Sequence, residues 1–338
     1  MLIQKQLING KLYSKILNQT IIDCINTIHN KFQVKLCLAI IIIGNNPSSL
    51  LYIRNKMLMA KKIGVGCKLI NYNASVSQDQ ILDDIDKLNK DNSITGILIQ
   101  LPLPNNLDKI MILNSILPYK DVDGFGEKNS FLLSRGYLNL DKIRLHNNYL
   151  LDLFSNTNNN YMAIIPCTAI GVLRLIQATC CNIFLKQDFN LIKYSLDKVD
   201  VKNNIIGKKI LIVGCSNIVG KPTAELMLHE RATITIAHKE TKNLEQEFLN
   251  NEIIILATGV AGLLNPKFIR DNSIIIDVGI SKQRDSSGSE YVCGDFNSKD
   301  LQNQIISYSP VPGGVGPMTI SCLFENLILC YYNRSILV

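Results

Sequence analysis

The sequence lacks the residue patterns that several classes of protein require. It has no CxxC pair and only four histidines, none at ligand spacing from a cysteine, so we expect no bound metal. It also has no basic cluster with interleaved aromatic residues, which argues against binding to nucleic acid. The longest apolar run, residues 36–43, is far too short for a bilayer and predicts a strand. Residues 1–18 contain no apolar segment of secretory length, so we expect no signal peptide and no membrane contact.

The composition is typical of a globular α/β protein with one large or two ordinary domains. Of 338 residues, 47% are hydrophobic and 19% are charged. The net charge of +7 suits an anionic small ligand such as a phosphorylated cofactor, although a solvated basic surface explains most of these lysines equally well. The ten cysteines, with no CxxC spacing, predict reduced thiols in a cytoplasmic protein.

The most informative segment is KKILIVGCSNIVGKP, residues 208–222. A short apolar strand runs into a tight loop and then into the start of a helix. Gly214 permits a sharp turn and Gly220 permits close backbone approach, while Pro222 suits the first helical turn. A second β-branched strand follows at 233–237, so the βαβ spacing directs backbone amides and a helix N-terminus towards a phosphate. A nucleotide cofactor is the leading hypothesis; an ordinary βα turn is the alternative, since the pattern is not GxGxxG.

Strands and helices alternate along the rest of the chain, which predicts parallel sheets covered by helices. Two polar stretches, 139–161 and 186–204, interrupt the alternation and are interpreted as surface insertions. We expect the first of them to carry no catalytic group.

Four local patterns are candidates for chemistry. Tyr52 and Lys56 share one face of a predicted helix, and Gln100 ends a predicted strand, where open α/β sheets place their sites. Residues 120–125, KDVDGF, bring two carboxylates into a loop, and residues 310–317, PVPGGVGP, constrain the backbone directly before a helix. For the first three patterns, surface side chains and an Asx-turn are the plainer alternatives. The fourth favours a functional role, because a simple loop rarely needs so many prolines and glycines.

Together these residues give the chain a family resemblance. It resembles the bifunctional methylenetetrahydrofolate dehydrogenase/methenyltetrahydrofolate cyclohydrolases from about residue 8 to residue 330. Six motifs in order carry the resemblance: YIRNK at 52–56, GILIQLPLP at 96–104, KDVDGF at 120–125, PCT at 166–168, GCSNIVGKP at 214–222 and PVPGGVGPMT at 310–319.

The resemblance implies two α/β domains, the second a Rossmann-like doubly wound parallel sheet, with a cleft between them. The expected ranges are a folate-binding catalytic domain at 1–146, an NADP-binding domain at 147–309, and a loop and helix returning to the first domain at 310–338. It also implies NADP-dependent oxidation of methylene-tetrahydrofolate, hydrolysis of the methenyl product to formyl-tetrahydrofolate, and a homodimer acting in one-carbon folate metabolism.

The resemblance assigns roles to the candidate residues. Lys56 is the expected central catalytic group, Gln100 its hydrogen-bonding partner, Tyr52 a contact to the folate, and Asp123 the group that binds the pterin ring. Further substrate contacts are expected from Pro312, Gly313 and Gly314. The expected cofactor-binding residues are Gly214, Cys215, Ser216, Ile218, Gly220, His238, Lys239, Thr241 and Ile280.

The end of the second Rossmann strand carries the signal for cofactor choice. An NAD site often has an acidic residue there, whereas this chain has Lys239, a candidate partner for the extra phosphate of NADP. The acidic Glu240 beside Lys239 argues against this interpretation. The alternative is that Lys239 points to solvent and binds no phosphate.

The chain also departs from the family pattern. Cys215 stands where Arg or Ala is frequent, and Thr258-Gly-Val-Ala-Gly262 stands where Gly-Lys-Pro-Gly is usual, so Val260 and Ala261 alter the cofactor side. Two other functions therefore stay open: a cyclohydrolase whose nucleotide site has drifted, and a non-enzymatic nucleotide-binding module.

Overall fold

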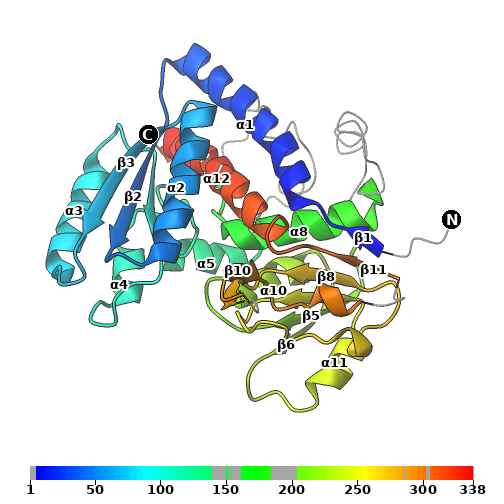
Figure 1. The fold of residues 1–338 in the computed structure, drawn as a ribbon. Helices are drawn as coiled ribbons and strands as arrows, with labels where there is room; N and C mark the ends of the chain where they lie inside the picture. Colours follow the sequence, from blue (N-terminus) through cyan, green and yellow to red (C-terminus); the bar gives the residue numbers. More distant parts are fainter. Residues whose placement is uncertain are drawn as a thin grey trace. The chain divides into compact units, whose positions relative to one another are not determined.

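The chain forms two compact α/β units, which are described one at a time. The computed structural model describes residues 5–138, 150, 153, 161–183, 204–284, 287–301 and 305–337. The described residues within Met1–Ile16 and Thr168–Thr319 form one unit, called here the six-stranded unit. Those within Leu17–Asn139, Asn148–Cys167 and Ile320–Val338 form the other, the three-stranded unit (Figure 1). The three domain ranges expected from the sequence stay a prediction.

A parallel sheet with the strand order β1-β11-β8-β7-β5-β6 is the centre of the six-stranded unit. Its inner strands are short runs of buried isoleucine, leucine and valine, as expected where helices cover both faces. The strands are β1 Lys5–Leu7, β5 Lys209–Val213, β6 Thr233–Ala237, β7 Ile253–Leu256, β8 Ile274–Asp277 and β11 Ile306–Tyr308.

Helices and one hairpin complete the six-stranded unit. Phe248 of α11 packs against Leu211, Ile254 and Ile275, which point to one face of the sheet from three neighbouring strands. The antiparallel hairpin of β9 and β10 lies between β8 and β11 in the chain. The elements are α8 Cys167–Cys180, α10 Gly220–His229, α11 Leu244–Asn250, β9 Ser281–Arg284 and β10 Glu290–Cys293.

The three-stranded unit is built on a parallel sheet with the order β3-β2-β4. Ala39, Ile41 and Ile43 of β2 alternate along the strand and pack against Ile81 and Ile85 of α3. Helices α2 and α3 lie on opposite faces of this sheet (Figure 1). The elements are β2 Cys37–Ile43, α2 Pro47–Ile63, β3 Gly66–Tyr72, α3 Gln78–Lys90, β4 Gly96–Ile99, α4 Lys109–Asn114 and α5 Glu127–Ser134. Two longer helices, α1 Gly10–Phe32 and α12 Val315–Leu337, contribute residues to both units.

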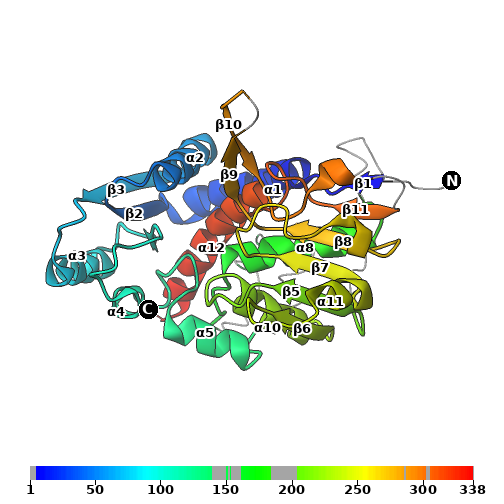
Figure 2. The ribbon, with the colours of Figure 1, turned by 60° about the horizontal axis from the view of Figure 1, so that its bottom comes forward.

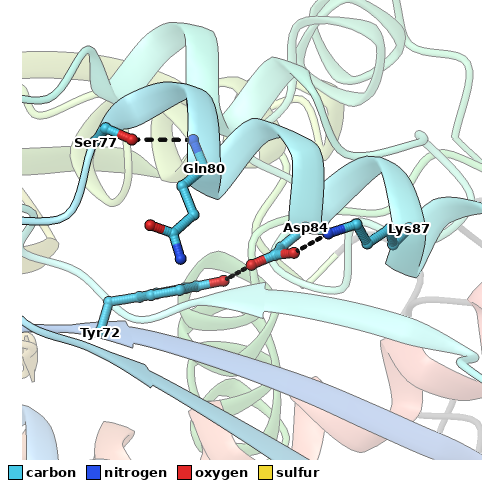
Figure 3. A network of polar contacts seen from close by, with 5 residues as sticks. All are labelled: Tyr72, Ser77, Gln80, Asp84 and Lys87. Atoms are coloured by element: carbon cyan, nitrogen blue, oxygen red, sulfur yellow. Dashed lines mark hydrogen bonds and ion pairs between the residues drawn. The ribbon is translucent and has the colours of Figure 1, made fainter.

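A small polar network fastens α3 to the edge strand β3 (Figure 3). The Tyr72 hydroxyl, at the end of β3, donates to Asp84 Oδ2 at 2.5 Å, and Lys87 Nζ donates to Asp84 Oδ1 at 2.7 Å. The bond from Lys87, followed by that from Tyr72, lowers the pKa of Asp84. At the start of the helix, Ser77 Oγ caps the backbone N–H of Gln80 at 3.3 Å. Helix and strand are therefore joined by polar contacts as well as by the apolar core.

The α/β fold class predicted from the sequence is confirmed, and most elements lie within a few residues of their expected positions. The strand predicted at 233–237 matches β6 residue for residue. The helix expected directly after residues 310–317 begins slightly earlier, at Val315, and continues to Leu337 as α12 (Figure 2). Strand β1 was not predicted, since three residues are too few to show a period. The predictions for 139–161 and 186–204 fall almost wholly outside the described residues.

Within the part of the chain that is described, no helix is long and apolar enough to cross a membrane.

A buried lysine closes the C-terminal end of α3. Lys120 is 1% exposed, and its Nζ donates to the carbonyls of Leu88 at 2.9 Å, Asn89 at 2.8 Å and Asp91 at 2.8 Å. These carbonyls lie at the helix end, where no intrahelical donor is available. Burial lowers the pKa of Lys120 to about 8, so the group is still mostly cationic at pH 7 and supplies three donors.

We predict that Lys120→Met lowers the free energy of unfolding by about 2–4 kcal/mol, because three buried carbonyls lose a charged donor. Urea unfolding followed by circular dichroism measures the change. Lys90→Met is the matched control: Lys90 is exposed and pairs with exposed Asp86, so we expect a loss below about 0.5 kcal/mol. Equal losses in the two variants would contradict the capping role.

Candidate functional site

Helix α2 carries the first predicted site residues, and its ends are defined by the sequence. The Asn46 side chain accepts from the backbone N–H groups of Ser48 at 3.0 Å and Ser49 at 3.1 Å, and Pro47 occupies the first turn. Gly64 ends the helix at φ +79°, a left-handed conformation that suits glycine. These caps define the ends of α2, and the burial of Ile53, Ala60 and Ile63 sets which face of the helix is turned to the core.

Lys56 and Gln100 meet across 44 residues of sequence. Lys56 Nζ donates to Gln100 Oε1 at 3.0 Å in a partly buried position. Gln100 directly follows β4, and its backbone N–H donates to Ile41 O at 2.8 Å, which continues the pairing with β2. Its Nε2 donates to Leu101 O at 2.8 Å. The amide is therefore held with its oxygen towards the lysine, and one N–H of Lys56 has a fixed direction.

A tightly held loop carries Asp123. The carboxylate of Asp121, 2% exposed, accepts from the backbone N–H of Gly124 at 3.0 Å and of Gly126 at 2.8 Å. It also accepts from Asn129 Nδ2 at 3.2 Å. Burial raises the pKa of Asp121 to about 6, and these donors oppose the rise. Asp121 thus organises the loop from within and holds the backbone that follows Asp123.

Asp123 lies close enough to Lys56 for their charges to interact. Burial raises the pKa of the Asp123 carboxyl, and the positive charge of Lys56 works in the opposite direction. The structure thus brings Lys56, Gln100 and Asp123 into one neighbourhood of the three-stranded unit. Tyr52 lies one helical turn before Lys56, half-buried, and burial raises the pKa of its hydroxyl, which therefore stays protonated at neutral pH.

The sequence interpretation missed two supports of this neighbourhood. Cys167 Sγ lies 3.7 Å from Asp123 Oδ1, and burial raises the pKa of its thiol well above the ordinary value. Asn326 of α12 is fully buried, and its Nδ2 donates to the carbonyls of Val122 and Ile165, each at 2.8 Å. The Pro-Cys-Thr motif pointed to Cys167, but a lone asparagine in an apolar helix gave no signal for Asn326.

In the six-stranded unit the loop between β5 and α10 has the close backbone contacts that require glycine. Gly214 has φ +117°, and a Cβ built there would lie 2.4 Å from Ala257 O. A Cβ on Gly220 would lie 1.8 Å from Gly214 O. Ser216 Oγ accepts from the N–H groups of Val219 at 3.2 Å and Gly220 at 3.5 Å. Cys215 and Ser216 are exposed and Ile218 is half-buried, so this loop at the sheet's carboxyl edge can cradle a phosphate.

The turn after β6 carries three further candidates. Thr241 Oγ1 accepts from the backbone N–H of His238 at 2.9 Å, and Thr241 N–H donates to His238 O at 2.8 Å. Lys239 is fully exposed, and its Nζ lies 3.7 Å from Glu240 Oε1. Such an exposed pair leaves the lysine available to a phosphate. Ile280, in the turn after β8, is 47% exposed.

The Pro-Gly-Gly segment before α12 is also constrained by backbone contacts within the six-stranded unit. Gly313 has φ +114° and its carbonyl accepts from Lys11 N–H at 2.9 Å. Gly314 N–H donates to Pro310 O at 2.8 Å, and a Cβ on Gly10 would meet Gly314 O at 1.9 Å. Pro312 is exposed beside them. The candidates thus fall into two groups, with Tyr52, Lys56, Gln100 and Asp123 in one unit and the other predicted residues in the second.

A glycine-rich βα loop at the carboxyl edge of a parallel sheet, and a lysine fixed by a glutamine, define a nucleotide-dependent α/β enzyme. The chain belongs to the tetrahydrofolate dehydrogenase/cyclohydrolase family. The model of the family's catalytic domain matches residues 8–123, and that of its NAD(P)-binding domain matches residues 194–335.

Known proteins similar to this chain support the same conclusion over nearly its full length. The Bifunctional protein FolD of Ehrlichia canis (strain Jake) is 33% identical over 98% of this chain and 96% of its own. That of Rickettsia massiliae (strain Mtu5) is 36% identical over 87% and 85%. The FolD methylenetetrahydrofolate dehydrogenase/cyclohydrolase structure from Campylobacter jejuni has a TM-score of 0.78 and 32% identity, covering 98% of this chain and 99% of that one. The Trypanosoma brucei FolD structure, complexed with NADP and an inhibitor, has a TM-score of 0.79 and 26% identity, covering 98% of both chains.

We predict that Gly220→Ala weakens NADP binding at least tenfold, because its Cβ would overlap the Gly214 carbonyl and displace the loop. Quenching or enhancement of NADPH fluorescence measures the dissociation constant. Gly288→Ala is the control for backbone strain alone, since Gly288 has φ +82° with open space around it. Unchanged affinity in folded Gly220→Ala would show that the loop does not hold the cofactor.

Proposed function

We propose that this chain is a bifunctional folate enzyme in which one lysine-centred site serves two consecutive reactions. It oxidises methylene-tetrahydrofolate to methenyl-tetrahydrofolate with NADP and hydrolyses the product to formyl-tetrahydrofolate. The observation that supports this most strongly is the 3.0 Å bond between Lys56 Nζ and Gln100 Oε1, in a chain that both family models match. With Lys56 and the glycine loop both intact, neither a cyclohydrolase with a drifted nucleotide site nor a non-enzymatic module is favoured.

The residues of the six-stranded unit fit the cofactor. The close contacts at Gly214 and Gly220 fix the tight path of the loop, whose backbone amides are the proposed partners of the phosphate oxygens. The loop also carries the exposed side chains of Cys215 and Ser216. Lys239 is the proposed partner of the ribose phosphate that distinguishes NADP from NAD, with Thr241 beside it. When bound, the oxidised nicotinamide accepts a hydride from the folate's methylene carbon.

The substrate's ring is the proposed ligand of Asp123 and Tyr52. A carboxylate can accept hydrogen bonds from the amino and ring N–H groups of a pterin, and the loop bonds of Asp121 keep Asp123 in place for this. Tyr52 offers an aromatic surface and a protonated hydroxyl, one turn from Lys56. We propose Pro312, which is exposed, with Gly313 and Gly314 beside it, as further substrate contacts.

Lys56 is the proposed proton carrier of the hydrolysis. A water adds to the methenyl carbon and loses a proton, and one carbon–nitrogen bond then breaks as its nitrogen gains a proton. The proposed role of the Lys56 amine is that of general base for the first proton and then of general acid, returning that proton to the leaving nitrogen. Gln100 keeps the amine pointed at the reacting carbon, because its oxygen holds one N–H and leaves the others for substrate and water. Oxidation and hydrolysis take place at the same carbon, so one site centred on Lys56 can serve both reactions.

We predict that Lys56→Met lowers cyclohydrolase activity at least 100-fold and leaves the dissociation constant of NADP within about twofold, since its loss removes the proton carrier but not the glycine loop. Methenyl-tetrahydrofolate hydrolysis and NADPH fluorescence give the two values. Lys62→Met, at an exposed position of the same helix, is the control and should retain parent activity. Near-parent hydrolysis by Lys56→Met would remove Lys56 from the mechanism.

We predict a preference for NADP over NAD that Lys239→Ala narrows by about tenfold or more, the value of one charge-assisted phosphate contact. Steady-state kinetics with both cofactors give the ratio of the two kcat/KM values. Lys242→Ala, two residues after Glu240 and also exposed, should leave the ratio unchanged. A parent enzyme that prefers NAD would contradict the choice of cofactor, whereas an unchanged ratio in Lys239→Ala would contradict only the role of that lysine.

Location and assembly are further parts of the proposal. All ten cysteines are described and none forms a disulfide, which supports a reducing, cytoplasmic environment.

Strand β6 is at one edge of the six-stranded sheet, with Ile236 exposed by 42%, and Leu228 of α10 is exposed by 61%. An exposed apolar edge strand favours pairing with a second copy of the chain, as in a homodimer. Sedimentation velocity can measure the oligomeric state.

A further inference from the structure

A buried carboxylate supports the loops at the carboxyl edge of the six-stranded sheet. Asp295 follows the hairpin strand β10 and is fully buried. Its Oδ2 accepts from the backbone N–H of Thr258 at 2.7 Å, from Thr258 Oγ1 at 2.7 Å and from the N–H of Gly259 at 3.1 Å. Three donors on one oxygen hold the loop that follows β7 at its second and third residues.

The backbone around Asp295 holds the far side of the same loop. Asp295 O accepts from Leu264 N–H at 3.1 Å, and Gly294 O accepts from Gly262 N–H at 3.4 Å. Residues 258–264 are therefore held at both ends by the segment 294–295. This loop contains Val260 and Ala261, between the two held ends.

Asp295 also contacts the loop that follows β8. A Cβ built on Gly279 would lie 1.9 Å from Asp295 Oδ1, so Gly279 packs directly against the carboxylate. That oxygen has no hydrogen-bond partner in the described part of the chain. Asp277 completes the support: its Oδ1 accepts from the N–H groups of Gly279 at 2.9 Å and Asp295 at 3.1 Å. The residue after Gly279 is the exposed Ile280.

The two loops are joined to each other as well. Ser281 Oγ donates to Gly259 O at 2.6 Å. Strands β8, β7 and β5 are neighbours in the sheet, so these loops lie beside the glycine loop at the edge where open α/β sheets bind cofactors. One carboxylate thus contacts both cofactor-side loops next to the phosphate loop.

We propose that Asp295 is a positioning residue for the nicotinamide end of the cofactor, acting through Gly259 and through Gly279 with Ile280. The proposal depends on the proposed function, because it assigns Asp295 to the oxidation and not to the hydrolysis. The glycine loop and Lys239 hold the phosphates and the adenosine end without Asp295. Removing the charge of Asp295 therefore misplaces the nicotinamide and leaves adenosine binding and the lysine site as they are.

The variant Asp295→Asn tests the proposal, since it keeps the size of the side chain and removes its charge. We expect dehydrogenase kcat/KM to fall at least tenfold, chiefly through KM for NADP, with cyclohydrolase activity within about twofold of the parent. Inhibition by 2′,5′-ADP, which lacks the nicotinamide, should keep its parent inhibition constant. Equal weakening of NADP and 2′,5′-ADP would overturn the proposal, because it would show a general loss of the unit's structure.

Two more variants keep the test decisive if Asp295→Asn does not fold. Thr258→Val keeps the carboxylate but removes the Oγ1–Oδ2 bond and the 3.1 Å bond that Thr258 Oγ1 accepts from Val260 N–H. It should lower dehydrogenase kcat/KM about threefold to fivefold, with hydrolysis unchanged. Asp300→Asn, an exposed residue five positions further on, is the matched control and should match the parent in both reactions. If Thr258→Val also leaves the dehydrogenase unchanged, Asp295 does not position the cofactor. A parent protein without NADP-dependent oxidation would instead contradict the proposed function itself.

Discussion

The hydrogen bond between Lys56 and Gln100 is the contact on which the proposed chemistry depends. A long, flexible lysine side chain becomes useful for catalysis only when its amine has a fixed position and direction. Gln100 supplies both, because its backbone is paired with β2 and its amide nitrogen is bonded to Leu101 O. The caps of α2 fix the other partner. Helix α2, which carries Lys56, and the end of strand β4, which carries Gln100, thus together position the Lys56 amine.

The second constraint is steric and concerns backbone atoms. At Gly214, Gly220 and Gly10, a Cβ would lie within 2.4 Å of a carbonyl oxygen. At these positions a larger residue must displace the backbone, so the glycines are needed for the chain path itself. The same logic applies to Gly124, where a Cβ would meet Ile164 O at 2.3 Å beside the Asp123 loop. In each unit, taken by itself, close approach of backbone segments therefore shapes the chain beside the candidate residues.

Much of this architecture could be predicted from the sequence, and the failures have physical causes. Apolar runs bounded by glycine and proline predicted the inner strands, because such strands are buried on both faces. The Lys56 helix was predicted from Asn46, Pro47 and Gly64, which act locally. In contrast, Asp295 accepts and Asn326 donates hydrogen bonds across long stretches of chain, and a single polar residue leaves no periodic trace. The three-residue strand β1 pairs with β11 about 300 positions away, which no local pattern can indicate.

The most direct test of the account is to give the purified protein methylene-tetrahydrofolate with NADP and follow both products in one reaction. The account predicts that NADPH forms in step with consumption of methylene-tetrahydrofolate, and that formyl-tetrahydrofolate accumulates in the same amount. Formation of methenyl-tetrahydrofolate that the protein does not hydrolyse faster than buffer alone would contradict the shared lysine site. A protein that hydrolyses added methenyl-tetrahydrofolate but reduces no NADP would contradict the bifunctional assignment.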